Sequence, residues 1–340
     1  MEKVELSRFQ TQGILGTGAD YEVRSALDQE TGKQVVLKRP MPQMISRQLH
    51  GGTEARTERM LQFFQEFGDA ICGVVPPIGY TDPGNHDEFY GDSLGQEYRV
   101  IVEERAAGIP LLVGDMLARI TGVPIGVGQN LFALFPLFQP EGQGRFPVHQ
   151  QLMDTEESFF NAGYVLLDLR PQNLFYQPAS GRITIVDCAD LVSANGETKP
   201  GSRTPRDIHD FYLELLKFYT TPKSPPEQAA DYREPYGLRP VVRFEQELDE
   251  MGDGFREASG PGEDAMLHLI SRVRERGYSD FERFRQDLNV YLEAVSARNQ
   301  SLSESGQSRQ AWNEALGWLK GDHWQRYIFD PEVELAAFDL

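Results

Sequence analysis

The sequence has few of the residues that build disulfide frameworks, metal clusters or membrane spans. It contains two cysteines, Cys72 and Cys188, too few for a disulfide framework or a cysteine metal site, and this fits a reducing cytoplasm. Its six histidines are scattered without the spacing of metal ligands. Charged side chains interrupt the most apolar long window, residues 109–138, so we expect buried helices there and no membrane span. The first ten residues contain no apolar stretch typical of a signal peptide, and we therefore expect a cytoplasmic protein.

Basic residues are also scarce relative to acidic ones. The chain has 33 Lys and Arg against 52 Asp and Glu, which gives a net charge of −19. This charge disfavours a nucleic-acid backbone or an anionic membrane as the main partner, so we expect no nucleic-acid partner. A hydrophobic content of 40% over 340 residues provides a core for one large or two ordinary domains.

The stretch from residue 162 to residue 191 has the clearest chemical meaning. An apolar run ends on Asp168, and a turn then leads to Asn173. A short strand, a hairpin turn and a second strand follow, and the second strand stops at Asp187. Phosphoryl transfer to a hydroxyl uses such a set, because one carboxylate orients the hydroxyl while an amide and a second carboxylate hold magnesium.

Two segments of this stretch, D-L-R-P-Q-N-L and I-V-D-C-A, resemble the catalytic loop and the metal-binding segment of the protein kinase superfamily. The resemblance implies that Asp168 orients the acceptor hydroxyl and takes its proton, and that Asn173 and Asp187 hold Mg2+ on the phosphates of ATP. Arg170 would neutralise charge that develops near the γ-phosphate. The simpler alternative is a solvent-facing Asp-Pro-Asn turn followed by an aspartate that caps a strand. The two segments together, in this order, favour the kinase interpretation.

The N-terminal part carries a second set of matching residues. The segments L-G-T-G-A-D-Y-E-V and T-G-K-Q-V-V-L-K resemble the kinase glycine-rich loop and the strand with the phosphate-binding lysine. A Gly-x-Gly turn lets backbone N–H groups approach phosphate oxygens. The resemblance implies that Gly16 and Gly18 form this turn, that Val23 covers the adenine ring and that Lys38 contacts phosphate. Tyr21 replaces the usual third glycine, which would leave a bulky side chain at the tip of the loop.

A helix is predicted over residues 52–68, with Thr53 as its N-cap. In the resemblance, a glutamate of this helix holds Lys38. Glu58 suits that role and Glu54 is the alternative, and the sequence does not separate them.

Residues 98–103 predict a buried strand that runs into a segment similar to the hinge between the two kinase lobes. The resemblance places Val102 at the gatekeeper position beside the adenine. It assigns the adenine edge to the backbone of Glu103 and Arg105.

The resemblance as a whole implies an α+β, bilobal, protein-kinase-like fold. A small antiparallel N-lobe would comprise residues 1–105, a larger and mainly helical C-lobe residues 106–300, and a helical tail residues 301–340. Residues 109–150 match poorly and include a predicted insertion. A helix that begins at Asp207 resembles the central helix of the C-lobe, whose first aspartate braces the catalytic loop.

The acceptor of the phosphoryl group stays open between two classes. The segment between Asp187 and Asp207 is short and has no A-P-E sequence, which favours a small-molecule hydroxyl. The G-T-G turn and the L-R-P-Q-N form of the catalytic loop favour a protein serine or threonine, and this class is slightly preferred.

A catalytically inactive pseudokinase that binds nucleotide or a protein partner is the remaining alternative. Tyr21, the Cys188-Ala189 pair after the metal-binding aspartate, and the absence of His-Arg before Asp168 favour it. Because each residue type that contacts magnesium or phosphate is present, we expect an active phosphotransferase that uses ATP and Mg2+.

Overall fold

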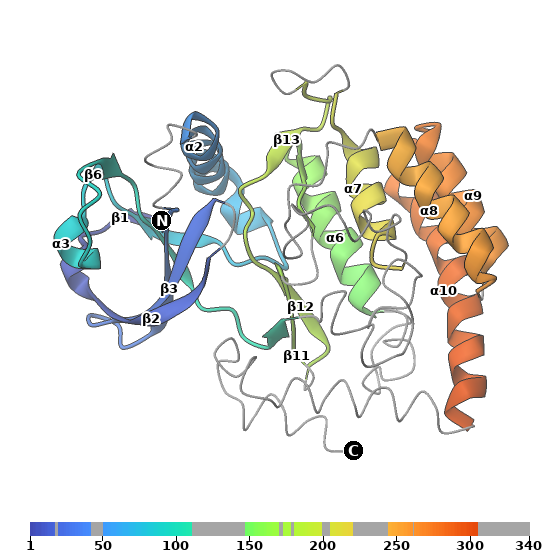
Figure 1. Cartoon of the computed structure of the whole chain (residues 1–340), viewed down its shortest axis with the longest axis horizontal. Helices are drawn as coiled ribbons and strands as arrows, with labels where there is room; N and C mark the ends of the chain where they lie inside the picture. The colour runs from blue at the N-terminus through green and yellow to red at the C-terminus, as the bar shows by residue number, and fades with distance from the viewer. Residues whose placement is uncertain are drawn as a thin grey trace, which may run out of the picture. The chain divides into compact units, whose positions relative to one another are not determined.

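The chain has an α+β fold that divides into two compact units (Figure 1). The computed structural model describes residues 1–17, 20–41, 50–110, 147–169, 173–177, 180–198, 205–219, 244–260 and 262–304. One unit comprises residues 1–107 and 184–191, and the other comprises residues 108–183 and 192–340. The first division falls close to the predicted boundary after residue 105. Residues 184–191, which include Asp187, belong to the first unit and not to the C-terminal part as predicted.

The first unit is built on a six-stranded sheet with the order β1-β5-β8-β4-β3-β2. Its strands are β1 (Glu2–Lys3), β2 (Phe9–Thr17), β3 (Tyr21–Asp28), β4 (Gln34–Pro40), β5 (Pro77–Tyr80) and β8 (Ile101–Glu104). Neighbours pair antiparallel except β1 and β5, which are parallel. The other elements of this unit are η1 (Leu6–Arg8), α2 (His50–Phe67), η2 (Gly68–Ala70), β6 (Gly84–Asn85), α3 (Asp87–Tyr90) and β7 (Glu97–Tyr98).

The two faces of this sheet differ in chemistry because side chains alternate along each strand. One face carries a core cluster of buried residues: Leu6, Phe9, Ala26, Val35, Leu37, Tyr90, Tyr98, Val100 and Val102. Lys38 and Glu103 follow Leu37 and Val102 in the sequence, so they lie on the opposite face. Val23 pairs with Lys38 across β3 and β4 and shares that face.

The second unit contains the remaining helices and most residues of the small sheets; residues 184, 185 and 191 of these sheets belong to the first unit. Strand β10 (Tyr164–Leu166) pairs with β13 (Leu191–Ser193), and β11 (Leu174–Gln177) lies between β12 (Arg182–Ile185) and β9 (Ile109–Pro110). Its described helices are α6 (Pro147–Asn161), α7 (Ile208–Leu216), α8 (Phe244–Ala258), α9 (Glu263–Arg274) and α10 (Phe281–Glu304). Helix α9 packs against both α8 and α10 (Figure 1).

Helix α7 is fixed at its start and along its buried face. Asp207 and Asp210 form a capping box at its N-terminus, in which the side chain of each aspartate accepts a hydrogen bond from the backbone N–H of the other aspartate. Tyr212 stacks on Phe284 of α10 with ring centroids 4.0 Å apart. These contacts hold α7 in place, and α7 carries Glu214 to the candidate site.

Several predictions from the sequence concern residues that the structure does not describe. Gly18, Arg170, residues 111–146 and residues 305–340 of the predicted helical tail lie outside the described residues. Among the helices that the structure does describe, none combines the length and the apolar character needed to cross a membrane.

Candidate functional site

Lys38 and Glu103 form a buried ion pair on the sheet of the first unit. Lys38 Nζ lies 2.8 Å from Glu103 Oε2, and the two side chains are only 7% and 4% exposed. In the register of β4 and β8, Val36 pairs with Glu103 and Lys38 pairs with Ile101. Lys38 and Glu103 are therefore diagonal neighbours on one face, which is within reach of long side chains.

Two carboxylates act on the charge of Lys38. Burial by itself lowers the pKa of Lys38, but Glu103 and Asp187 outweigh it, and the pKa is raised. Burial is also the main cause that raises the pKa of Glu103; Asp187 adds to this while Lys38 opposes it. Lys38 is thus kept as a cation in a nearly dry environment, which is the state needed for a contact with phosphate.

The partner of Lys38 is Glu103 and not Glu58, which corrects the prediction. Glu58 is exposed on α2 and Glu54 is half-buried. The face of α2 that turns inward carries Thr53 and Thr57, one helical turn apart, and both are buried. A helix residue just beyond Thr57 in the sequence points away from that face, whereas Glu103 is brought to Lys38 by the strand ladder itself.

The predicted position of Val102 beside the nucleotide is also wrong. Val102 packs with Leu37 in the core cluster on the opposite face of the sheet. The alternation of side chains along β8 therefore gives the face of Lys38 to Glu103, whose side chain, and not only its backbone, belongs to the candidate site.

The remaining predicted nucleotide contacts of the first unit lie on the strands around Lys38. Val23 is half-buried, and Gly16 of β2 is its register partner. The Arg105 guanidinium donates to Ser25 Oγ at 3.4 Å, and burial lowers the pKa of Arg105. Gly16, Val23 and Arg105 therefore belong to the same unit as Lys38.

Helix α2 contacts the residues that follow the glycine turn. Asp20 Oδ1 accepts a hydrogen bond from Thr53 at 2.9 Å and pairs with Arg56 at 2.6 Å. The Tyr21 hydroxyl hydrogen-bonds Thr57 Oγ1, and the Tyr21 side chain is buried. Tyr21 is therefore anchored under α2, which differs from the expected bulky tip at the end of the loop.

Asp187 follows a strand that is firmly attached to the first unit. The Ile185 N–H donates to Gly73 O at 2.8 Å, and the Val75 N–H donates to Ile185 O at 2.9 Å. Arg59 of α2 donates to Leu191 O at 2.9 Å on the other side of Asp187. The segment around Asp187 is thus held at both ends.

Asp168 follows β10 in the second unit, and two glutamates hold the backbone on either side of it. Glu156 of α6 accepts from the Leu166 N–H at 3.1 Å, and Glu214 of α7 accepts from the Leu169 N–H at 2.6 Å. The Asn173 amide donates to the Asp168 carbonyl at 3.3 Å, so these two predicted site residues lie next to each other.

The brace of this loop differs from the predicted one. Asp207 caps α7, accepts from the His209 N–H at 2.8 Å and pairs with Arg276. Glu214 contacts the loop instead, and sequence reasoning missed it. A signal was present, because Glu214 is the single charged residue in an otherwise apolar run, Phe211–Leu216.

Glu214 titrates near neutral pH. Burial raises its pKa to about 7, and the charge of Asp168 also raises it, whereas Lys217 and Arg206 act in the opposite direction. Its Oε1 lies 3.8 Å from Arg206 Nη2. The group that braces the Asp168 loop is therefore itself sensitive to pH.

Glu214→Gln is expected to change how the free energy of unfolding depends on pH. Because the folded protein keeps a proton on Glu214 that the unfolded chain releases, stability is lost as pH rises from about 4.5 to about 7. The loss approaches about 3 kcal/mol, and glutamine avoids it. In urea unfolding at pH 5 and pH 8, the free energy of unfolding of the variant relative to that of the wild type should be higher at pH 8 than at pH 5. The exposed Glu282→Gln serves as the control, and an equal difference at both pH values for Glu214→Gln would contradict the assignment.

Asp168 and Asp187 have an unusual backbone conformation with positive φ. Among the described residues, the non-glycine residues with positive φ are Asp168, Asp187, Ser259 and Arg276. Ser259 and Arg276 follow the ends of α8 and α9, where a left-handed residue is common. Asp168 and Asp187, each with φ of 66°, follow no helix. A left-handed conformation of this kind costs energy and concentrates at functional sites.

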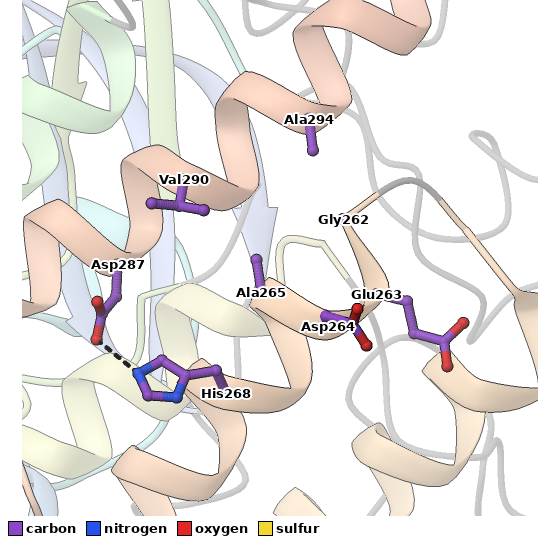
Figure 2. A pocket seen from close by; sticks show the side chains of 8 residues that line it. All are labelled: Gly262, Glu263, Asp264, Ala265, His268, Asp287, Val290 and Ala294. Atoms are coloured by element: carbon purple, nitrogen blue, oxygen red, sulfur yellow. Dashed lines mark ion pairs between the residues drawn. The ribbon is translucent and has the colours of Figure 1, made fainter.

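A separate hollow of about 640 Å³ lies along α9 and α10 in the second unit (Figure 2). His268 Nε2 lies 3.2 Å from Asp287 Oδ2 at one end of it. Its acidic residues Glu263 and Asp264 belong to the first turn of α9, where carboxylates stabilise a helix N-terminus. None of the predicted site residues lines this hollow.

The comparisons with known proteins give no match: neither a family model nor a curated protein matches this chain. Across the described residues, no group of three or more His, Cys, Asp or Glu side chains is placed to hold a metal ion.

Proposed function

We propose that the protein is an ATP-dependent phosphotransferase with a divergent protein-kinase-like fold, which transfers the γ-phosphate of ATP to a hydroxyl. The observation that carries this proposal is the backbone of Asp168 and Asp187. The sequence pattern selected these two residues for chemistry, and both have a left-handed φ of 66° that no helix end explains.

The first unit supplies groups that suit a nucleotide. Lys38 is a buried cation that would contact the phosphates, and Glu103 holds its ammonium group. The face around Lys38 also carries Val23, an apolar side chain of the kind that would cover a base. Asp187 lies close enough to raise the pKa of Lys38, so a carboxylate and an ammonium act on the same region.

The second unit supplies the group that would act on the acceptor. Asp168 would orient the hydroxyl and accept its proton late in the transfer. Glu156 and Glu214 hold the neighbouring amides, so the Asp168 carboxylate starts from a fixed backbone. Asn173 is kept beside Asp168 by its own hydrogen bond.

Mg2+ is a hard cation that prefers carboxylate and amide oxygens, which are the oxygens that Asp187 and Asn173 carry. Asp187 and Asn173 would hold it. When bound, Mg2+ neutralises charge on the transferred phosphoryl group. We favour a serine or threonine hydroxyl of a protein as the acceptor; a small-molecule hydroxyl is the alternative within the same chemistry.

A nucleotide-binding protein without catalysis is the second candidate. The observations that favour it are Tyr21 in place of the third glycine, with its side chain anchored on Thr57, and Cys188-Ala189 directly after Asp187. In such a protein Lys38 and Glu103 would serve the fold and the binding of nucleotide only.

The test of the proposal combines turnover with binding. Purified protein is given γ-labelled ATP with and without Mg2+, and phosphate release and autophosphorylation are followed; thermal shifts with ATP are recorded in parallel. We expect Mg2+-dependent release of phosphate that Asp187→Asn abolishes, with the exposed Asp253→Asn as the control. Stabilisation by ATP without any movement of phosphate would favour the second candidate. The absence of any ATP effect on wild-type melting would overturn both.

A further inference from the structure

We propose that Glu103 is the positioning residue of Lys38, so that the lysine is oriented from within the sheet and not by helix α2. The inference rests on the proposed function for its consequences, because it names the residue that prepares Lys38 for nucleotide. Its structural content, the pair itself, stands whether or not the protein transfers phosphate.

The strand ladder fixes both members of the pair. β4 and β8 are hydrogen-bonded neighbours in the middle of the sheet, and four residue pairs define their register. Within this register Lys38 Nζ and Glu103 Oε2 are 2.8 Å apart. Because β8 also pairs with β5 on its other side, neither strand shifts along the other without breaking the sheet.

The neighbouring ion pair between Lys33 and Glu104 differs from the Lys38–Glu103 pair in its exposure to solvent. Lys33 Nζ lies 2.9 Å from Glu104 Oε1, but these side chains are 65% and 53% exposed. An exposed pair of this kind is screened by water and contributes little. Glu103 is next to Glu104 in the sequence but points to the other face, and there its carboxylate is enclosed with Lys38.

Helix α2 is attached to a different part of the site. Among the described side-chain hydrogen bonds and ion pairs of α2, those of Thr53, Arg56 and Thr57 run to Asp20 and Tyr21, and that of Arg59 runs to the Leu191 carbonyl. A displacement of α2 would therefore act first on Asp20 and Tyr21 and on the segment that follows Asp187. It would leave the Lys38–Glu103 pair intact, and Lys38 would stay ready for phosphate in either position of the helix.

The first arm of the experiment needs no turnover. In the nucleotide-free protein, we expect a nuclear Overhauser effect between the Lys38 Hε and Glu103 Hγ protons, with assignments made from Lys38→Arg and Glu103→Gln. The same signal should persist in Thr53→Ala/Thr57→Ala, which removes the hydrogen bonds of α2 to Asp20 and Tyr21 made by these two threonines. Loss of the signal in this α2 variant, or a signal from Lys38 to Glu58 in place of Glu103, would overturn the inference.

The second arm measures kcat/KM for MgATP in folded variants. Glu103→Gln should lower it at least about tenfold, because the hydrogen bond to a charged group is lost, and Glu103→Asp should recover part of the rate. Glu58→Gln and the matched control Glu104→Gln should stay within about twofold of the wild type. A loss with Glu58→Gln that equals the loss with Glu103→Gln would overturn the inference. If the wild type transfers no phosphate, the proposed function fails, while the first arm still decides the pairing.

Discussion

Replacing Asp168 with asparagine is expected to lower the rate of phosphate transfer by about 10²–10⁴-fold, while ATP continues to bind. An asparagine side chain accepts no proton from the acceptor hydroxyl, so the transfer loses its general base. The variant should fold, because asparagine also tolerates the left-handed backbone that Asp168 adopts. Its neighbours Leu166 and Leu169 keep their hydrogen bonds to Glu156 and Glu214.

Single-turnover transfer at saturating MgATP measures this loss directly, and KM for MgATP should change little. Asp253→Asn, which removes an exposed carboxylate paired with Arg256, is the control and should transfer at the wild-type rate. Asp187→Asn should differ from Asp168→Asn by weakening the Mg2+ dependence of ATP binding itself. An unchanged rate in Asp168→Asn would remove Asp168 from the chemistry and, with it, the main support for the proposed reaction.

The local parts of the fold could be predicted because they depend on neighbouring residues. Alternation and turn residues indicated the strands around Lys38 and the hairpin between Asn173 and Asp187, and the structure has β3, β4, β11 and β12 there. The α+β class, which the resemblance implied, is confirmed by the strands and helices of the structure. The resemblance to protein kinases stays a prediction.

The residues that hold the site were harder to predict, because they depend on register and on packing between distant segments. The choice of Glu103 over Glu58 is made by the pairing of β4 with β8, which no local pattern of residues encodes. The choice of Glu214 over Asp207 depends on which residue of α7 faces the loop. For the loop, the prediction named the correct helix, and packing selected another of its carboxylates. For Lys38, the prediction named a residue of α2, and strand pairing selected a residue of β8 instead.

Lys38→Met should be one of the most destabilising single substitutions in the first unit. It removes one partner of a buried ion pair and leaves Glu103 enclosed beside Asp187, for which the expected loss is about 3–5 kcal/mol in the free energy of unfolding. Burial already raises the pKa of Glu103, and without Lys38 it should rise further. The loss should therefore grow as pH rises above the unfolded-state pKa of about 4.5, since the folded variant keeps a proton on Glu103 that the unfolded chain releases.

The double variant Lys38→Met/Glu103→Leu distinguishes the contribution of the ion pair to stability from the contribution of Lys38 to nucleotide binding. It replaces both charges by apolar side chains, so most of the lost stability should return, because exchanging a complete buried pair for apolar groups is close to neutral. Nucleotide binding should stay lost, since no ammonium remains for phosphate. Urea unfolding at pH 5 and pH 8 provides the measurement, and Lys33→Met, which breaks the exposed pair with Glu104, should leave the free energy of unfolding close to that of the wild type. Equal losses for Lys38→Met and Lys33→Met would show that Lys38 and Glu103 are not enclosed together, and the pair would then be too weak to orient the lysine.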